Sequence, residues 1–201
     1  MKPKKDNSTF LQKKRLRLSL LKEIEHPIVF ETHGGTGKLY QACYSTIKTG
    51  VVCEKDPKKT GVLGKQRKHW FVYECDCISA IKHGVGGQIG INLFDLDPYG
   101  EPWPIIDTIL GNDYYMPKIL AIVVNDGLRQ KLKMNGGWSV RSMEAVVKEF
   151  GNNYLYPNYL EICKHLIISK ALDAGYALKR WTGYYCGHAN QMTHYAAILE
   201  R

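Results

Sequence analysis

Apolar residues recur along the chain in short uninterrupted runs, separated by turn-forming residues and by helical segments. Such runs indicate strands that are buried on both faces, as in a parallel sheet covered by helices. The pattern predicts seven strands, at residues 28–32, 50–54, 70–75, 89–96, 119–124, 176–183 and 192–199. It predicts helices at residues 10–24, 38–48, 57–66, 104–110 and 160–174. Strands and helices therefore alternate through most of the chain.

The C-terminal part departs from this alternation. Gly175 follows the last predicted helix in the usual C-cap position. Only a polar loop with Gly187 and Asn190 separates the last two predicted strands. Strands joined without an intervening helix pair antiparallel. We therefore expect an α/β fold with a doubly wound, mostly parallel, Rossmann-like seven-stranded sheet and an antiparallel C-terminal hairpin.

A glycine-rich turn, Glu31-Thr32-His33-Gly34-Gly35-Thr36-Gly37, connects the first predicted strand to the next helix. Glycines let the backbone approach a ligand closely, and the start of the helix offers unpaired N–H groups. The turn does not match a phosphate-binding loop, because Thr32 replaces its first glycine and Leu39 its final Ser or Thr. We predict that the turn approaches a nucleoside-containing cofactor closely at His33, Gly34, Gly35 and Gly37, although any tight strand-to-helix turn can use glycine.

Two further positions at strand ends suit the same cofactor. Glu54 ends the second strand, about 20 residues after the glycine turn, where α/β folds place a carboxylate for ribose hydroxyls. Asp76 and Cys77 end the third strand, where a side chain and a backbone amide can contact an adenine edge. Glu54 could instead end its strand at the surface without a ligand.

The segment Phe94-Asp95-Leu96-Asp97-Pro98-Tyr99-Gly100 ends the fourth strand, on the edge where such sheets bind ligands. Its turn offers a carboxylate, a proline carbonyl of fixed direction and an aromatic ring that can stack on a base. These groups can hold an exocyclic amine and stabilise the positive charge that develops on its nitrogen. We predict a catalytic role for Asp97, Pro98, Tyr99 and Gly100, with a rigid surface turn as the alternative.

These residues resemble the tRNA guanine-N2 dimethyltransferase family, which reads D-L-D-P-F-G-S-P with a downstream D-T-x-L. Here residues 94–102 and Asp107-Thr108-Ile109-Leu110 carry the resemblance. It extends more weakly to the glycine turn, to residues 74–77 and to residues 184–199. Five αβ units with a terminal hairpin are likewise typical of class I methyltransferases. The resemblance implies S-adenosylmethionine as cofactor, held by Glu31, the glycine turn, Glu54 and Asp76, and an amine site at residues 97–100.

Two features differ from the family. Its members carry a further C-terminal domain, which residues 1–201 do not include. In the glycine turn, His33-Gly34-Gly35 stands where the family tends to have small residues. Both differences are compatible with amine methylation. They prevent the resemblance from identifying which nucleic acid is methylated.

The positive charge is concentrated at the N-terminus. Residues 1–22 carry eight Lys or Arg and one Asp, so +7 of the net charge of +9 lies there. A basic arm suits nucleic-acid phosphates, although a solubilising tail would look the same. We divide the chain into an arm and helix, residues 1–26, and a methyltransferase domain, residues 27–201. Nucleic-acid contacts are predicted at Lys13, Lys14, Arg15, Arg17 and Trp138, with RNA favoured over DNA; packing of its own loop is the alternative role of Trp138.

Other classes of protein fit less well. No apolar stretch approaches the roughly 20 residues of a membrane span, and we expect a cytoplasmic protein without a metal site. Six scattered cysteines suit a reducing compartment. The predicted function is methylation of guanine in RNA. A DNA amino-methyltransferase is an alternative, although such enzymes commonly have a second proline where Tyr99 stands. A catalytically silent RNA-binding subunit is the other alternative, but it would not need the residue 97–100 turn.

Overall fold

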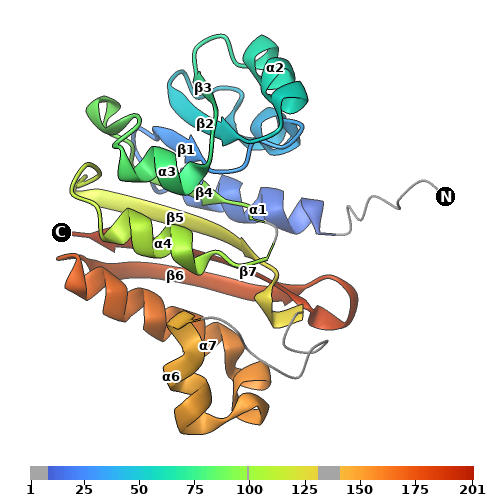
Figure 1. Ribbon diagram of the computed structural model, residues 1–201, viewed down its shortest axis with the longest axis vertical. Helices are drawn as coiled ribbons and strands as arrows, with labels where there is room; N and C mark the ends of the chain where they lie inside the picture. Colours follow the sequence, from blue (N-terminus) through green and yellow to red (C-terminus); the bar gives the residue numbers. More distant parts are fainter. Residues whose placement is uncertain (1–8, 99, 131–140) are drawn as a thin grey trace.

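The computed structural model describes residues 9–98, 100–130 and 141–201, which form one seven-stranded sheet with helices on both faces (Figure 1). The strands are β1 (Val29–Glu31), β2 (Gly50–Glu54), β3 (Phe71–Glu74), β4 (Leu93–Leu96), β5 (Ile119–Asp126), β6 (Ala177–Cys186) and β7 (Met192–Glu200). The α-helices are α1 (Phe10–Leu21), α2 (Pro57–Gln66), α3 (Cys77–Lys82), α4 (Trp103–Leu110), α6 (Arg141–Phe150) and α7 (Asn152–Asp173). Within the described ranges, no helix has the length and apolar character needed to cross a membrane.

The order of the strands confirms the predicted topology. It runs β3-β2-β1-β4-β5-β7-β6. The first five strands in this order pair in parallel, whereas β7 runs antiparallel to both β5 and β6. The winding direction reverses between β1 and β4, and α/β sheets bind their ligands at such a switch point, outside the carboxyl ends of the strands.

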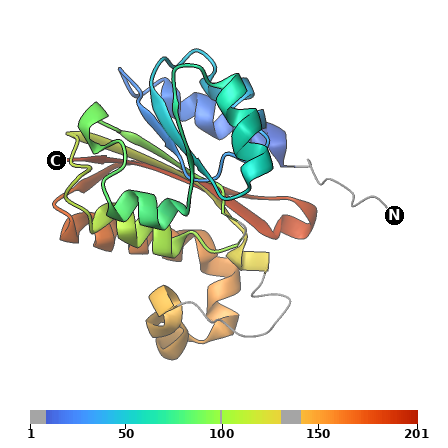
Figure 2. The same ribbon diagram turned by 45° about the horizontal axis from the view of Figure 1, so that its top comes forward.

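Successive strand residues pack into two hydrophobic cores on opposite faces of the sheet. Phe30 and Phe94 belong to the core that contains residues of α3, α4 and α7, whereas Val29 and Leu93 belong to the core that contains residues of α1. Figure 2 shows α1 on one side of the sheet and α3, α4 and α7 on the other. All four residues of β4 are buried, as expected for a parallel strand covered on both faces.

The N-terminal helix is part of this packed unit. Leu16, Leu20 and Ile24 are buried in the same core as Val29 and Leu93, and α1 contacts β5 and β7. The helix that we group with the basic arm therefore shares a core with residues 27–201.

Several element boundaries differ from the expectations for local reasons. The helix after the glycine turn is short, with a π-helical segment at Tyr40–Tyr44. β4 begins at Leu93 because a 3-10 turn, Gly87–Ile89, and the left-handed Gly90 (φ 74°) precede it. Residues 77–82 form α3, which was not expected. α7 begins at Asn152 and not at residue 160, and α6 was not expected either.

Candidate functional site

The loops after β1 and β4 meet the start of α1 at the carboxyl edge of the sheet. They enclose a cavity of about 220 Å³. Its lining residues are Phe10, Lys13, Glu31, His33, Gly34, Gly35, Thr36, Lys38, Leu39 and Asp97. The glycine turn and the Asp97 turn, which are distant in sequence, therefore line the same space.

A second, smaller cavity of about 90 Å³ adjoins the first toward β2 and β3. It is lined by Thr32, His33, Glu54, Lys55, Cys75 and Cys77. His33 lines both cavities, so the two meet at this side chain. Burial lowers the pKa of His33, although Asp97 and Glu54 oppose the shift. The expected cofactor positions at the ends of β1, β2 and β3 thus lie along one edge.

The glycine turn can exist only with glycine at several positions. A Cβ on Gly34 would lie 2.4 Å from Leu63 Cδ1 and 2.7 Å from Val52 Cγ2. Gly35 and Gly37 have φ values of 55° and 77°, which disfavour other residues. A Cβ on Gly35 would meet no described atom within 4 Å. The turn thus packs tightly against α2 at Gly34, whereas space for a ligand adjoins Gly35.

Glu54 is held against this turn by the backbone. Its Oε2 accepts a hydrogen bond from Gly35 N (2.8 Å), and its Oε1 accepts one from Asp56 N (3.1 Å). A carboxylate oxygen has room for a second hydrogen bond, so both oxygens can still accept from a ligand. The arrangement suits a diol, such as the hydroxyls of a ribose.

Asp76 and Cys77 lie next to the small cavity, at the start of α3. The Asp76 carboxylate caps this helix by accepting a hydrogen bond from Ser79 N (2.9 Å), and it pairs with Lys55 Nζ (2.6 Å). The hydrogen bond from Lys55 lowers the pKa of Asp76. Burial raises the pKa of Cys77 to about 11, so its sulfur stays a neutral thiol at pH 7.

Glu31 ends β1, directly before the glycine turn, and pairs with Arg67 at the end of α2. The two side chains are buried, and Arg67 Nη2 lies 2.7 Å from Glu31 Oε2. The guanidinium lies over the rings of Tyr40 (4.5 Å) and Trp70 (5.3 Å). Burial raises the pKa of Glu31 to about 8, against the opposing effect of Arg67. Glu31 therefore fixes the floor of the cavity.

Asp97 follows directly after β4 and accepts two hydrogen bonds from Lys13 of α1. Lys13 Nζ lies 2.9 Å from Oδ1 and 3.1 Å from Oδ2. Burial acts to raise the pKa of Asp97, but Lys13 and Arg17 bring it below its ordinary value. The Pro98 carbonyl accepts a hydrogen bond from Gly100 N (2.9 Å), which closes a tight turn. Tyr99 lies outside the described residues.

The structure corrects the expectation that Arg17 binds nucleic acid. Its side chain is fully buried, and its guanidinium donates to both carboxylate oxygens of Asp95, with Nε 2.6 Å from Oδ2. Tyr44 Oη donates a further hydrogen bond to Asp95 Oδ2 (2.6 Å). Arg17 is unavailable to a phosphate because it neutralises a buried carboxylate.

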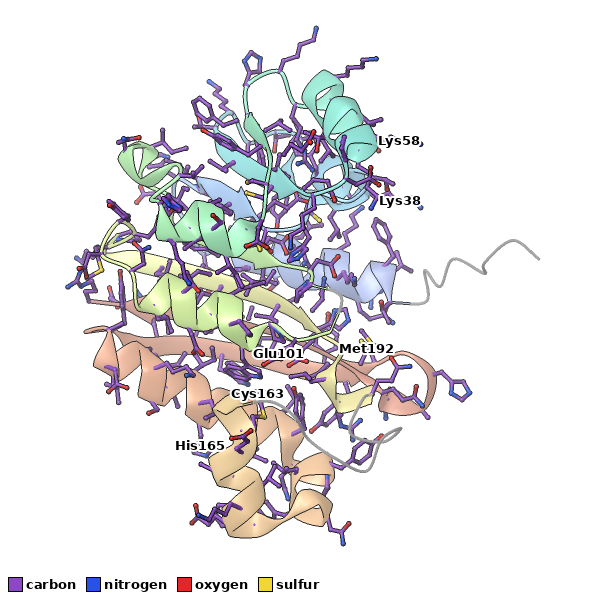
Figure 3. All side chains as sticks on the ribbon, viewed as in Figure 1. Lys38, Lys58, Glu101, Cys163, His165 and Met192 are labelled. Atoms are coloured by element: carbon purple, nitrogen blue, oxygen red, sulfur yellow. The ribbon has the colours of Figure 1, made fainter. Side chains whose placement is uncertain are left out.

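Other basic side chains, on α1 and after the glycine turn, are accessible to solvent. Arg15 and Lys38 are exposed, and Lys14 is half-buried. Figure 3 shows Lys38 and Lys58 on the same side of the molecule. Lys38 also lines the larger cavity, although the sequence motifs did not single it out. Trp138 lies outside the described residues, so its expected contact stays a prediction.

Comparisons with known proteins agree with this architecture. No protein-family model and no curated protein matches the sequence. Among solved structures, Pyrococcus horikoshii Trm1 with S-adenosyl-L-methionine superposes with a TM-score of 0.65 at 12% identity, over 96% of this chain and 54% of that one. Bradyrhizobium japonicum N-methyltransferase NodS with S-adenosyl-L-homocysteine gives 0.62 at 13% identity, over 98% and 89% of the two chains. M. jannaschii TYW2 with AdoMet gives 0.59 at 13% identity, over 100% and 79%.

The chain therefore has the fold of the S-adenosylmethionine-dependent methyltransferases. It spans about half the length of Trm1 and most of the length of the other two proteins. The sequence identities are too low to carry more than the fold.

Proposed function

We propose that this protein is an S-adenosylmethionine-dependent N-methyltransferase that acts on the exocyclic amine of guanine in RNA, such as tRNA. One observation carries the proposal: the glycine turn after β1 and the Asp97-Pro98 turn after β4 line the same cavity. A cofactor held at the first turn would thus lie beside an amine held at the second. Proximity of two reactants is among the largest contributions an enzyme can make.

The residues at this edge fit the proposed cofactor. Glu54 would accept hydrogen bonds from the ribose hydroxyls, because each of its oxygens keeps an acceptor position. Gly34 to Gly37 would lie against the cofactor with their backbone, and the open face at Gly35 leaves room for it. Asp76 and Cys77 would contact the adenine, since Cys77 lines the small cavity next to Glu54.

In the proposed reaction, the cofactor would supply the methyl group and residues of the chain would position the amine. When bound, S-adenosylmethionine would supply a methyl group on a positively charged sulfur. Its carbon–sulfur bond would break, leaving the electron pair on sulfur, as the amine nitrogen bonds to the carbon. Asp97 and the Pro98 carbonyl would accept the two amine N–H groups and orient the lone pair. The carboxylate would also stabilise the positive charge on nitrogen. The surplus proton then leaves to water.

RNA is favoured as the substrate by three observations. Residues 94–102 resemble the tRNA guanine-N2 dimethyltransferases. Lys38 offers exposed positive charge at the cavity, and Lys14 and Arg15 follow Lys13 on α1, whose start lines it. One further structural neighbour is described as a putative RNA methyltransferase, PH1948, with a TM-score of 0.50 at 12% identity over 94% of this chain. The target base would be single-stranded or turned out of its stack. We also propose that the protein acts in the cytoplasm.

The test is methyl transfer from radiolabelled S-adenosylmethionine to bulk tRNA, rRNA and duplex DNA, followed by digestion to nucleosides. We expect label in N2-methylguanosine from RNA. Label in DNA alone would replace the RNA substrate with DNA. Cofactor binding without transfer to any of the three would indicate a silent RNA-binding subunit and refute the proposal.

A further inference from the structure

The carboxylate assigned to the target amine already holds an amine of the protein itself. Lys13 Nζ contacts both oxygens of Asp97, at 2.9 and 3.1 Å. The pair is partly open to solvent, with side-chain exposures of 20% and 29%. Both residues line the cavity that also contains the glycine turn. An ammonium therefore occupies the position where the proposed function needs the substrate's amine.

This contact is built into the fold. Lys13 and Arg17 are one helical turn apart on α1, so they share a face, and they pair with Asp97 and Asp95, which are two residues apart at the end of β4. The buried Arg17–Asp95 pair fixes the helix against the strand. Tyr184 Oη also donates a hydrogen bond to the carbonyl of Gln12, next to Lys13 (2.5 Å).

Displacing Lys13 from Asp97 leaves its ammonium without a second unpaired carboxylate among the described residues that line this cavity. Of the described residues that line this cavity, only Glu31 and Asp97 carry a carboxylate. Glu31 is buried and already paired with Arg67 at 2.7 Å. An amine of a base is neutral, so it can replace the hydrogen bonds of Lys13 on Asp97 but cannot compensate its charge. A charge left unpaired in a partly buried site is unfavourable.

On the basis of the proposed function, we propose that Lys13 determines specificity: it gives up Asp97 to an incoming amine only when the substrate brings an anion to receive the ammonium. In a nucleic acid, the phosphodiester next to the target nucleotide is that anion, and a charged Lys–phosphate hydrogen bond replaces the Lys–carboxylate pair. The cavity then selects nucleotides within a phosphodiester chain over neutral compounds with the same base.

The experiment compares two RNA trinucleotides, uridine-guanosine-uridine with ordinary phosphodiester linkages and the same compound with neutral methylphosphonate linkages. Guanine carries the only exocyclic base amine in either compound. The kcat/KM of methyl transfer is measured for the wild type, Lys13→Met and Lys13→Arg. Lys22→Met is the matched control, because Lys22 is an exposed lysine at the other end of α1.

We expect the wild type, Lys13→Arg and Lys22→Met to prefer the phosphodiester compound by at least about tenfold. In Lys13→Met, this ratio should fall close to one, mainly because transfer to the neutral compound becomes faster. Circular dichroism of the variants checks that they are folded. A folded Lys13→Met protein with the wild-type ratio would overturn the proposal, as would a wild-type ratio near one.

Failure of this inference can be distinguished from failure of the proposed function. A wild-type protein that methylates bulk tRNA and methylates both trinucleotides with equal kcat/KM would overturn only the role of Lys13, because the amine would then be accepted without an anion. Absence of transfer to tRNA and to both trinucleotides would refute the proposed function itself.

Discussion

Replacement of Arg17 by methionine should destabilise the folded protein strongly. Arg17 Nε lies 2.6 Å from Asp95 Oδ2, and both side chains are almost completely inaccessible to solvent. Removing one partner of a buried ion pair leaves an uncompensated charge and typically costs about 3–5 kcal/mol. Tyr44 still donates to Asp95 at 2.6 Å, so we expect about 3 kcal/mol. That is a large part of the ~5–15 kcal/mol by which domains are stable.

Urea unfolding followed by far-UV circular dichroism measures this loss as a shift of the midpoint at constant slope. The double variant Arg17→Met/Asp95→Asn should recover most of the stability. The asparagine carries no charge, and its side-chain oxygen can still accept the hydrogen bond from Tyr44 Oη.

An Arg17→Met variant of unchanged stability would instead support the nucleic-acid contact that the sequence analysis predicted for Arg17. If Arg17→Met kept its stability within about 1 kcal/mol and instead lost affinity for RNA, Arg17 would be a phosphate contact. The packing of α1 on the sheet would then be wrong.

Three further predictions concern the cofactor, the nucleic acid and acid stability. Glu54→Ala should weaken S-adenosylmethionine binding about tenfold to a hundredfold by calorimetry, because charge-assisted hydrogen bonds are lost; unchanged affinity would remove Glu54 from the cofactor site. Lys14→Gln and Arg15→Gln should each reduce the slope of log K against log salt for RNA by about 0.7–0.9, and an unchanged slope would exclude phosphate contacts there. Burial lowers the pKa of His194 to about 3, so the wild type should lose folding stability as the pH falls from 6.5 toward 3. The His194→Phe variant should lose less folding stability over this range. An equal loss in both proteins would assign the acid sensitivity to other groups.

The sheet could be predicted because its central strands are apolar on both faces. β5 has seven buried residues in succession, and such a run leaves little choice of structure. The helices were harder. The expected start of α7 was late because Pro157 interrupts its first turns, yet the helix accommodates it. The apolar residues of α1 do not form a clean stripe because Arg17 belongs to its buried face.

The site could be predicted only where residues are close in sequence. The glycine turn, Glu54 and the Asp97 turn were recognised from local motifs, and the topology brings them to one edge. The ion pairs across that edge were not recognised. A basic N-terminus predicts exposed charge, and nothing in the composition indicates that Lys13 pairs with Asp97 or that Arg67 pairs with Glu31. Such pairs depend on how α1 and α2 pack, which the local pattern leaves open.

The central claim is that Asp97 receives the amine that is methylated. The most direct measurement is the single-turnover rate of transfer from S-adenosylmethionine to RNA for the wild type and Asp97→Ala. Asp113→Ala is the control, because Asp113 is exposed in the loop before β5. Circular dichroism and calorimetry establish that the variants are folded and bind the cofactor.

We expect Asp97→Ala to lower the single-turnover rate about 10²–10³-fold, the usual effect of removing one well-placed group that stabilises transition-state charge. Cofactor affinity should change far less, because Glu54 and the glycine turn lie on other strands, and Asp113→Ala should transfer at the wild-type rate. A folded Asp97→Ala protein that transferred methyl groups at the wild-type rate would contradict the account.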